Sequence, residues 1–166
     1  TKSDAMDTKF VLNNNAEHLN AALDLTGSLG FMGDARAVGI YRHDSDGGTG
    51  KLAAVVVFEC FRGGRAELHF GNTEGHRLTL NTLQGIIMLA FHPKAFNLDR
   101  LLARIPVWNT MSLSALIRIG FEVEYRDRAS TGQGSDAIVL SLDREAIISK
   151  ASAEPQTETK PETSGE

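Results

Sequence analysis

Two side chains that can carry a proton stand two residues apart in the stretch "RAELHFGN", residues 65–72. In a strand, Glu67 and His69 leave the same face of the backbone. A carboxylate or an imidazole in that position can accept a proton from an attacking nucleophile, directly or through a water molecule. A strand face that only meets solvent would show the same spacing. Glu67 and His69 are candidate bases, and Glu59 and Tyr125 are weaker ones.

A polar turn with two glycines follows this strand and opens a helical pattern. Residues 71–79 read "GNTEGHRLT". The N-terminus of a helix binds anions because its free backbone N–H groups and the helix dipole both point to the ligand. Arg77 stands where such a loop usually has a small residue, and its side chain would either obstruct a phosphate or pair with it. The turn therefore predicts an altered anion site.

Composition excludes several classes of protein. The 166 residues suffice for one domain with its own core, and 42% hydrophobic and 23% charged residues are ordinary for a globular protein. A net charge of −4 argues against nucleic-acid binding, for which a basic face is typical. No apolar run reaches the roughly 20 residues that span a membrane, and no signal-peptide pattern is present. We expect neither nucleic acid nor membrane as a partner, and a cytoplasmic location.

The single cysteine and the five histidines indicate no disulfide and no metal chemistry. One cysteine cannot form an internal disulfide. Cys60 lies in the apolar run "AAVVVFECF", which predicts a buried, inert thiol. The histidines are scattered without the spacing of metal ligands, so we expect no metal site.

Hydrophobic periodicity divides the middle of the chain into helices and strands. Period-two runs and glycine turns predict strands over 35–43, 51–61, 65–71, 99–107, 121–128 and 136–144. Helical spacing predicts helices over 16–29, 76–93 and 110–120. This order predicts an α+β domain with one mixed, mostly antiparallel sheet of six to seven strands, flanked by helices.

The two ends of the chain differ in composition from the middle. Residues 151–166 read "ASAEPQTETKPETSGE" and contain almost nothing apolar. Such a segment cannot bury enough surface to offset its ordering entropy, so we expect a disordered acidic tail. We also expect a flexible N-terminus over residues 1–10. The domain itself is expected over residues 11–150.

The most specific stretch is "RIPVWNTMSLSALIRIGFEVEYR", residues 104–126. Its Asn109, Ser112, Gly120, Phe121 and Glu124 match the form N-x-x-S-x-x-x-x-x-x-x-G-F-x-x-E. The stretch resembles the C-terminal half of the GCN5-related N-acetyltransferases, most of all the branch that acetylates the N-termini of ribosomal proteins. It is also similar to small acetyltransferase-like proteins of tailed bacteriophages. The resemblance covers roughly residues 36–144.

This resemblance implies a place for acetyl-CoA. In the family, acetyl-CoA lies in a V-shaped gap between two parallel strands, so the strand that leads to Asn109 should neighbour the one that ends near Phe70. The family's pyrophosphate loop, Q/R-x-x-G-x-G/A, corresponds here to Asn72-x-x-Gly75-x-Arg77. The cofactor-binding residues that the resemblance implies are Phe70, Gly71, Gly75, His76, Arg77, Leu78, Thr79 and Asn109.

The resemblance also implies a catalytic acid. Many family members place a tyrosine seven residues after the asparagine to protonate the leaving thiolate. That position is Leu116, which cannot donate a proton, so Ser112 is the remaining candidate. Three motif residues also have a structural explanation: Gly120 can end a helix, Phe121 can fill the core and Asn109 can cap a helix.

Two function classes follow. The first is an N-acetyltransferase that moves the acetyl group of acetyl-CoA to a primary amine, with a protein N-terminus as one such acceptor. The second is a non-catalytic protein of the same fold with a structural or host-binding role in a bacteriophage, where it would have protein partners and lie in the host cytoplasm or the virion. The altered loop and Leu116 favour the second class, and Ser112, Gly75 and Arg77 favour the first.

Overall fold

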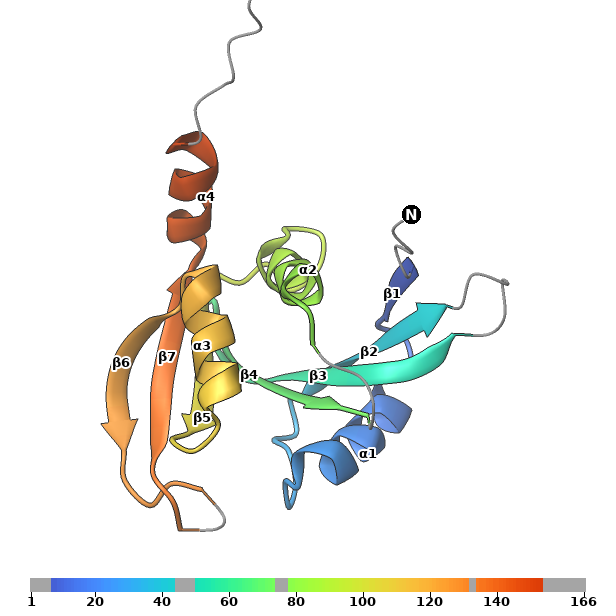
Figure 1. Ribbon diagram of the computed structural model, residues 1–166. Coiled ribbons are helices and arrows are strands. Elements are labelled where there is room, and N and C mark those ends of the chain that lie inside the picture. Colours follow the sequence, from blue (N-terminus) through green and yellow to red (C-terminus); the bar gives the residue numbers. More distant parts are fainter. Residues whose placement is uncertain (1–6, 44–49, 74–77, 132–133, 154–166) are drawn as a thin grey trace, which may run out of the picture.

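In the part of the chain that the structure describes, seven strands form one mixed sheet in the order β1-β2-β3-β4-β5-β7-β6 (Figure 1). This computed structural model describes residues 7–43, 50–73, 78–131 and 134–153. The strands are β1 Asp7–Val11, β2 Arg36–His43, β3 Lys51–Arg62, β4 Arg65–Asn72, β5 Arg100–Pro106, β6 Glu122–Asp127 and β7 Ala137–Asp143. All neighbouring strands run antiparallel except β4 and β5, which are parallel. The α+β class and the mixed, mostly antiparallel sheet expected from the sequence are confirmed.

The helices cover the two faces of the sheet unequally. They are α1 Asn15–Thr26, α2 Leu80–Phe91, α3 Thr110–Ile119 and α4 Arg144–Ala153. Helix α1 packs on β2, β3 and β4 from one face, and α2 and α3 lie on the other face (Figure 1). Helix α4 continues from β7 and extends beyond the sheet. None of the described helices is long and apolar enough to cross a membrane.

Strand alternation divides the core into two layers. The larger layer, between the sheet and helices α2 and α3, contains Phe58 and Leu68 with most of the other buried apolar side chains. The smaller layer lies under α1 and contains Val55 and Val57 of β3. Glu59 follows these two valines at the same alternation, so the α1 face changes from apolar to charged along β3.

Cys60 corrects one expectation from the sequence: its side chain is exposed rather than buried. The pairing of β3 with β4 shifts between Glu59 and Arg62, and Cys60 has a φ of 57°. This β-bulge turns the thiol away from the core. The Asp34 carboxylate holds the bulge, because it accepts hydrogen bonds from the backbone N–H groups of Cys60 (3.2 Å) and Phe61 (2.8 Å). Desolvation, followed by the nearby Glu59 carboxylate, raises the pKa of the thiol.

The structure adds two elements that the sequence analysis did not predict. Strand β1, in the segment expected to be flexible, pairs antiparallel with β2. Helix α4 reaches Ala153, three residues into the expected tail. Residues 1–6 and 154–166 lie outside the described residues, so the expected flexibility of both ends stays a prediction there.

Candidate active site

Strands β4 and β5 separate part-way along their length. They pair only over Arg65–Leu68 and Arg100–Ala103. Beyond this segment, β4 stays paired with β3 up to Asn72, and β5 stays paired with β7 up to Pro106. The two parallel strands therefore diverge toward their carboxyl ends, as Figure 1 shows. This confirms that the strand ending near Phe70 neighbours the strand that leads to Asn109.

Three side chains lie close together beside this gap, on the face of the sheet that α1 covers. They are Glu59, Glu67 and His69, and we call them the charged cluster. Nε2 of His69 lies 2.8 Å from Oε1 of Glu59 and 3.8 Å from Oε1 of Glu67. The ring nitrogen is buried and no acceptor is aligned with it, so these contacts are close approaches rather than directed hydrogen bonds. The backbone N–H of Met32 donates a 2.6 Å hydrogen bond to Oε2 of Glu59 and fixes that carboxylate. The arrangement can accept and hold a proton.

The β3–β4 hairpin explains why these three side chains share a face. Its turn residues Gly63 and Gly64 have φ of 55° and 77°, the backbone of a two-residue hairpin turn that requires glycine-like freedom. The bulge in β3, just before the turn, shifts the pairing by one residue and places Glu59 opposite Glu67. Glu59 thereby leaves the core face and reaches His69 diagonally across the two strands.

Arg104 of β5 contacts the charged cluster from the other side of the gap. Its Nε lies 3.4 Å from Oε1 of Glu67, and its Nη1 pairs with the Asp127 carboxylate of β6. Burial would lower the pKa of Arg104, but the charges of Glu67 and Asp127 outweigh it and raise the pKa. The sequence analysis missed this residue, because its partners come from β4 and β6 and the sequence carries no signal for their register.

Two helices begin at the carboxyl ends of the separating strands, on the opposite face of the sheet. Thr79 caps α2 by accepting a hydrogen bond from the Thr82 N–H (3.2 Å), and Asn109 caps α3 by accepting one from the Ser112 N–H (3.2 Å). The first N–H groups of a helix have no acceptor within the helix and carry part of the positive end of its dipole. A pocket of about 380 Å³ lies between the two helix starts. It is lined by Leu78, Leu80, Thr110, Met111, Ser114, Ala115 and Arg118.

Solved structures of acetyltransferases are similar to this chain. The spermidine/spermine N-acetyltransferase SpeG from Vibrio cholerae, solved in mutant forms, has a TM-score of 0.70 at 12% identity, over 87% of this chain and 99% of that chain. A proposed phosphinothricin N-acetyltransferase has a TM-score of 0.62 at 19% identity, over 82% of this chain and 98% of that chain. No protein-family model and no curated protein matches the sequence.

The chain has the fold of the GCN5-related N-acetyltransferases.

Within this acetyltransferase fold, the described residues that the sequence analysis assigned to the cofactor divide between the two faces of the sheet. Leu78 lines the pocket between α2 and α3, and Thr79 caps α2. Phe70 packs against the core under the helices. Gly71 lies on the α1 face, where a Cβ would come within 2.6 Å of Leu25. The structure thus gives Gly71 a packing reason, and its contact with a cofactor stays a prediction.

Three assigned residues, Gly75, His76 and Arg77, lie outside the described residues. The alternative readings of Arg77, as an obstruction or as a phosphate partner, therefore both stay predictions. Among the described residues, no group of three His, Cys, Asp or Glu side chains is placed to hold a metal ion.

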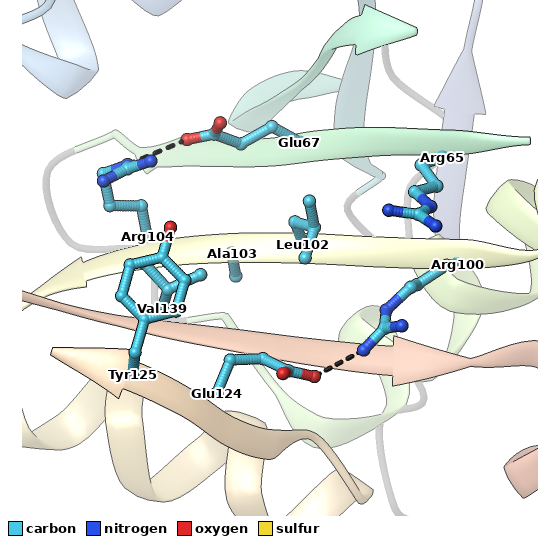
Figure 2. Close-up of a pocket in the computed structure, with 9 residues that line it drawn as sticks. All are labelled: Arg65, Glu67, Arg100, Leu102, Ala103, Arg104, Glu124, Tyr125 and Val139. Atoms are coloured by element: carbon cyan, nitrogen blue, oxygen red, sulfur yellow. Dashed lines mark hydrogen bonds and ion pairs between the residues drawn. The ribbon is translucent and has the colours of Figure 1, made fainter. Parts of the chain in front are cut away.

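The candidate acid lies on the other face of the fold from the candidate bases. Ser112 is half-buried in the first turn of α3, one turn before Leu116 on the same side of the helix. Leu116 is fully buried in the core, so the tyrosine position of the family is a packing position here. Tyr125 lies on β6 beside Arg104, where it lines a pocket on the α1 face (Figure 2).

Proposed function

We propose that this chain transfers the acetyl group of acetyl-CoA to a primary amine. The observation that carries the proposal is the separation of β4 and β5 beyond Leu68 and Ala103. The two strands part between the charged cluster on one face of the sheet and the starts of α2 and α3 on the other. The acetyltransferase fold supports the same reaction class.

The residues on the face that α2 and α3 cover fit a coenzyme that carries phosphates and a long flexible arm. The N-terminal N–H groups of α2 and α3 offer donors to phosphate oxygens, and the pocket between them has an apolar side at Leu78 and Ala115 and a cation at Arg118. Acetyl-CoA supplies an acetyl group activated as a thioester when it is bound. Leu78 and Thr79 would hold acetyl-CoA at the start of α2, and the Asn109 cap orders the start of α3.

The cluster on the α1 face prepares the amine. A primary amine is protonated at neutral pH and must lose a proton before it attacks a carbonyl carbon. His69 accepts this proton, and the carboxylates of Glu59 and Glu67 stabilise the resulting positive charge. Ser112, on the face covered by α2 and α3, donates a proton to the leaving thiolate and is reprotonated by the second proton that the amine nitrogen loses as the amide forms. Base and acid thus approach the gap from opposite faces of the sheet.

The acceptor belongs to the wide class of primary amines, with a protein N-terminus as the narrower proposal. The solved structures named above are described as acetyltransferases for spermidine, spermine or phosphinothricin. Leu116 favours the alternative, a protein of this fold without catalysis, because it removes the usual proton donor. The comparisons give no support to a bacteriophage role.

Calorimetric titration with acetyl-CoA tests the proposal before any acceptor is known. We expect the wild type to bind with a dissociation constant between about 1 μM and 1 mM, the usual range for enzyme substrates. Ser114→Trp fills the pocket between α2 and α3 and should weaken binding at least about tenfold. Ile117→Trp adds the same ring on the same helix, away from the pocket, and should bind like the wild type. Heat release that is absent in the wild type, or equal in both variants, contradicts the proposal.

A further inference from the structure

A second pocket, of about 270 Å³, lies on the α1 face over β4, β5, β7 and β6 (Figure 2). It begins beside the charged cluster, where Glu67, Arg104 and Tyr125 line it. It runs toward the amino ends of β4 and β5, where Arg65 and Arg100 line it. Leu102 and Val139 give it an apolar floor. We call this pocket the sheet groove.

A β-bulge in β6 shapes one wall of the sheet groove. The pairing of β6 with β7 shifts between Val123 and Tyr125, so that Glu124 has no single partner. Both Glu124 and Tyr125 therefore point to the α1 face, as Figure 2 shows. The Tyr125 ring forms a flat apolar wall with a polar end, which suits contact with an extended chain.

Three arginines on adjacent strands lie in a row at the far end of the sheet groove, and two of them, Arg65 and Arg100, line it. Arg62 of β3 is the cross-strand partner of Arg65, and Arg65 of β4 is the partner of Arg100. Partners in neighbouring strands share a face, so the three cations lie side by side. We call these three residues the arginine row.

Only one cation of the arginine row is neutralised within the described residues. Arg100 pairs with Glu124, lies 3.4 Å from Asp143 and donates a 2.9 Å hydrogen bond to the Ser141 hydroxyl. No described Asp or Glu lies within ion-pair distance of Arg62 or Arg65. Like charges directly opposite one another destabilise a sheet. An anion placed at this end would relieve the repulsion.

The sheet groove therefore has opposite electrostatic character at its two ends. Glu67 lines the end near the gap, next to Glu59 and His69, and Arg104 at this end is already paired with Glu67 and Asp127. Arg65 lines the other end without a described acidic partner, and Arg62 lies beside it on β3. His69 lies four residue steps along the extended strand from Arg65, or about 13 Å at roughly 3.3 Å per residue.

From this polarity we infer that the acceptor is an amine with a carboxylate at its far end, of the length of a short extended peptide. Its amino group lies at His69 and Glu67, its chain lies on Leu102 and Tyr125, and its carboxylate pairs with Arg65. The inference rests on the proposed function and narrows its substrate class. A polyamine, which carries a cation at both ends, does not match the basic end of the groove.

Calorimetric titration with peptides, in the absence of acetyl-CoA, tests the inference. The probes are Ala-Gly-Gly-Asp and Ala-Gly-Gly-Asn, both amidated at the C-terminus, and they differ in one carboxylate. We expect the aspartate peptide to bind at least about tenfold more tightly, since a charge-assisted contact with arginine typically has that effect. Added salt should reduce the difference.

Two arginine variants locate the effect on the groove. Arg65→Gln should abolish the preference for the aspartate peptide without lowering the thermal midpoint, because the side chain is exposed and its removal relieves repulsion in the arginine row. Arg36→Gln removes the same charge from the opposite face of the sheet and should keep the preference. Equal binding of the two peptides by the wild type, tighter binding of spermidine than of either peptide, or a preference that survives Arg65→Gln would overturn the inference.

The same titrations separate this inference from the proposed function. Acetyl-CoA binding that is absent while the peptide preference is present contradicts the transferase alone. Acetyl-CoA binding and acetyl transfer to amines without a peptide preference contradict the carboxylate-bearing acceptor alone.

Discussion

The Glu59 carboxylate lies 2.8 Å from Nε2 of His69, and its second oxygen accepts a hydrogen bond from the backbone N–H of Met32. Glu59 is only 9% exposed. One buried carboxylate thus joins the loop after α1 to the imidazole beside the gap. The relationship makes Glu59 a positioning residue for His69, because it fixes the ring and balances the charge that the ring acquires.

Glu59→Gln is expected to slow acetyl transfer about ten- to a hundredfold, the effect typical of a group that orients a catalytic histidine. The amide oxygen can still accept the Met32 hydrogen bond, so acetyl-CoA binding should be unchanged. The pH dependence of kcat should also change, because the negative charge beside His69 is lost. Steady-state kinetics measure both effects, and Glu145→Gln on α4 is the control. A normal rate with an unaltered pH profile would remove Glu59 from the mechanism.

Ser112→Ala tests the proton donor on the other side of the gap. We expect kcat to fall about a hundredfold or more, the usual contribution of a general acid, with the KM for acetyl-CoA unchanged. Ser112→Cys keeps a donor and should restore part of the rate. A variant that keeps full kcat would show that the leaving thiolate takes its proton from another source.

Gly39→Ala is expected to destabilise the fold although glycine has no special backbone angle there. A Cβ at Gly39 would lie 2.3 Å from Nε2 of His18, which is fully buried in α1. Overpacking of this kind typically costs about 1–3 kcal/mol, which lowers the Tm of a domain of this size by roughly 2–4 °C per kcal/mol. Thermal unfolding measures the change. Gly30→Ala, where a Cβ meets nothing within 4 Å, is the matched control and should leave the Tm unchanged.

His18 should make the fold sensitive to acid. Burial lowers its pKa below the ordinary 6.5, and the Glu17 carboxylate opposes this effect. Nε2 lies 3.2 Å from the Tyr41 hydroxyl, and Nδ1 has no partner. The unfolded chain binds a proton at His18 more readily than the folded chain, so the stabilisation is complete above pH 6.5 and is lost as the pH falls toward the folded pKa.

Urea unfolding at several pH values between 8 and 5 tests this expectation. The free energy of unfolding of the wild type should fall by at most about 1.4 kcal/mol per pH unit from His18 alone. His18→Gln removes the titration and should show a correspondingly flatter dependence. An equal slope in both proteins would show that His18 is not protonated on unfolding.

The sequence was sufficient to predict most of the fold, because the signals for its central elements are local. Gly63 and Gly64 predict a hairpin turn, Gly120 ends α3, and alternation predicts β4 and β5 with their faces. Two terminal elements were missed because little in their own sequence distinguishes them from loops. Strand β1 is short and is held in place by pairing with β2, and α4 has no apolar stripe.

The sequence predicts that Glu67 and His69 share a face, but it does not predict that Glu59 joins them, because a bulge in β3 decides which way Glu59 points. Counted back from the Gly63–Gly64 turn without a bulge, Cys60 would oppose Glu67 and Glu59 would point to the core. The bulge shifts the register, which exposes Cys60 and brings Glu59 to His69. Asp34, 26 residues before Cys60, holds the bulge through tertiary hydrogen bonds. A contact between residues so far apart in the sequence cannot be predicted from the local hydrophobic pattern.

Acetyl transfer itself is the most direct test of the account. Wild-type protein is incubated with acetyl-CoA and the amidated peptide Ala-Gly-Gly-Asp, and mass spectrometry follows acetylation of the peptide N-terminus. The account predicts enzyme-dependent acetylation that falls about a hundredfold or more in His69→Ala, the usual contribution of a general base, and that also falls in Ser114→Trp. Peptide that stays unmodified by a wild type that binds acetyl-CoA, or acetylation that is equal in wild type and His69→Ala, would contradict it.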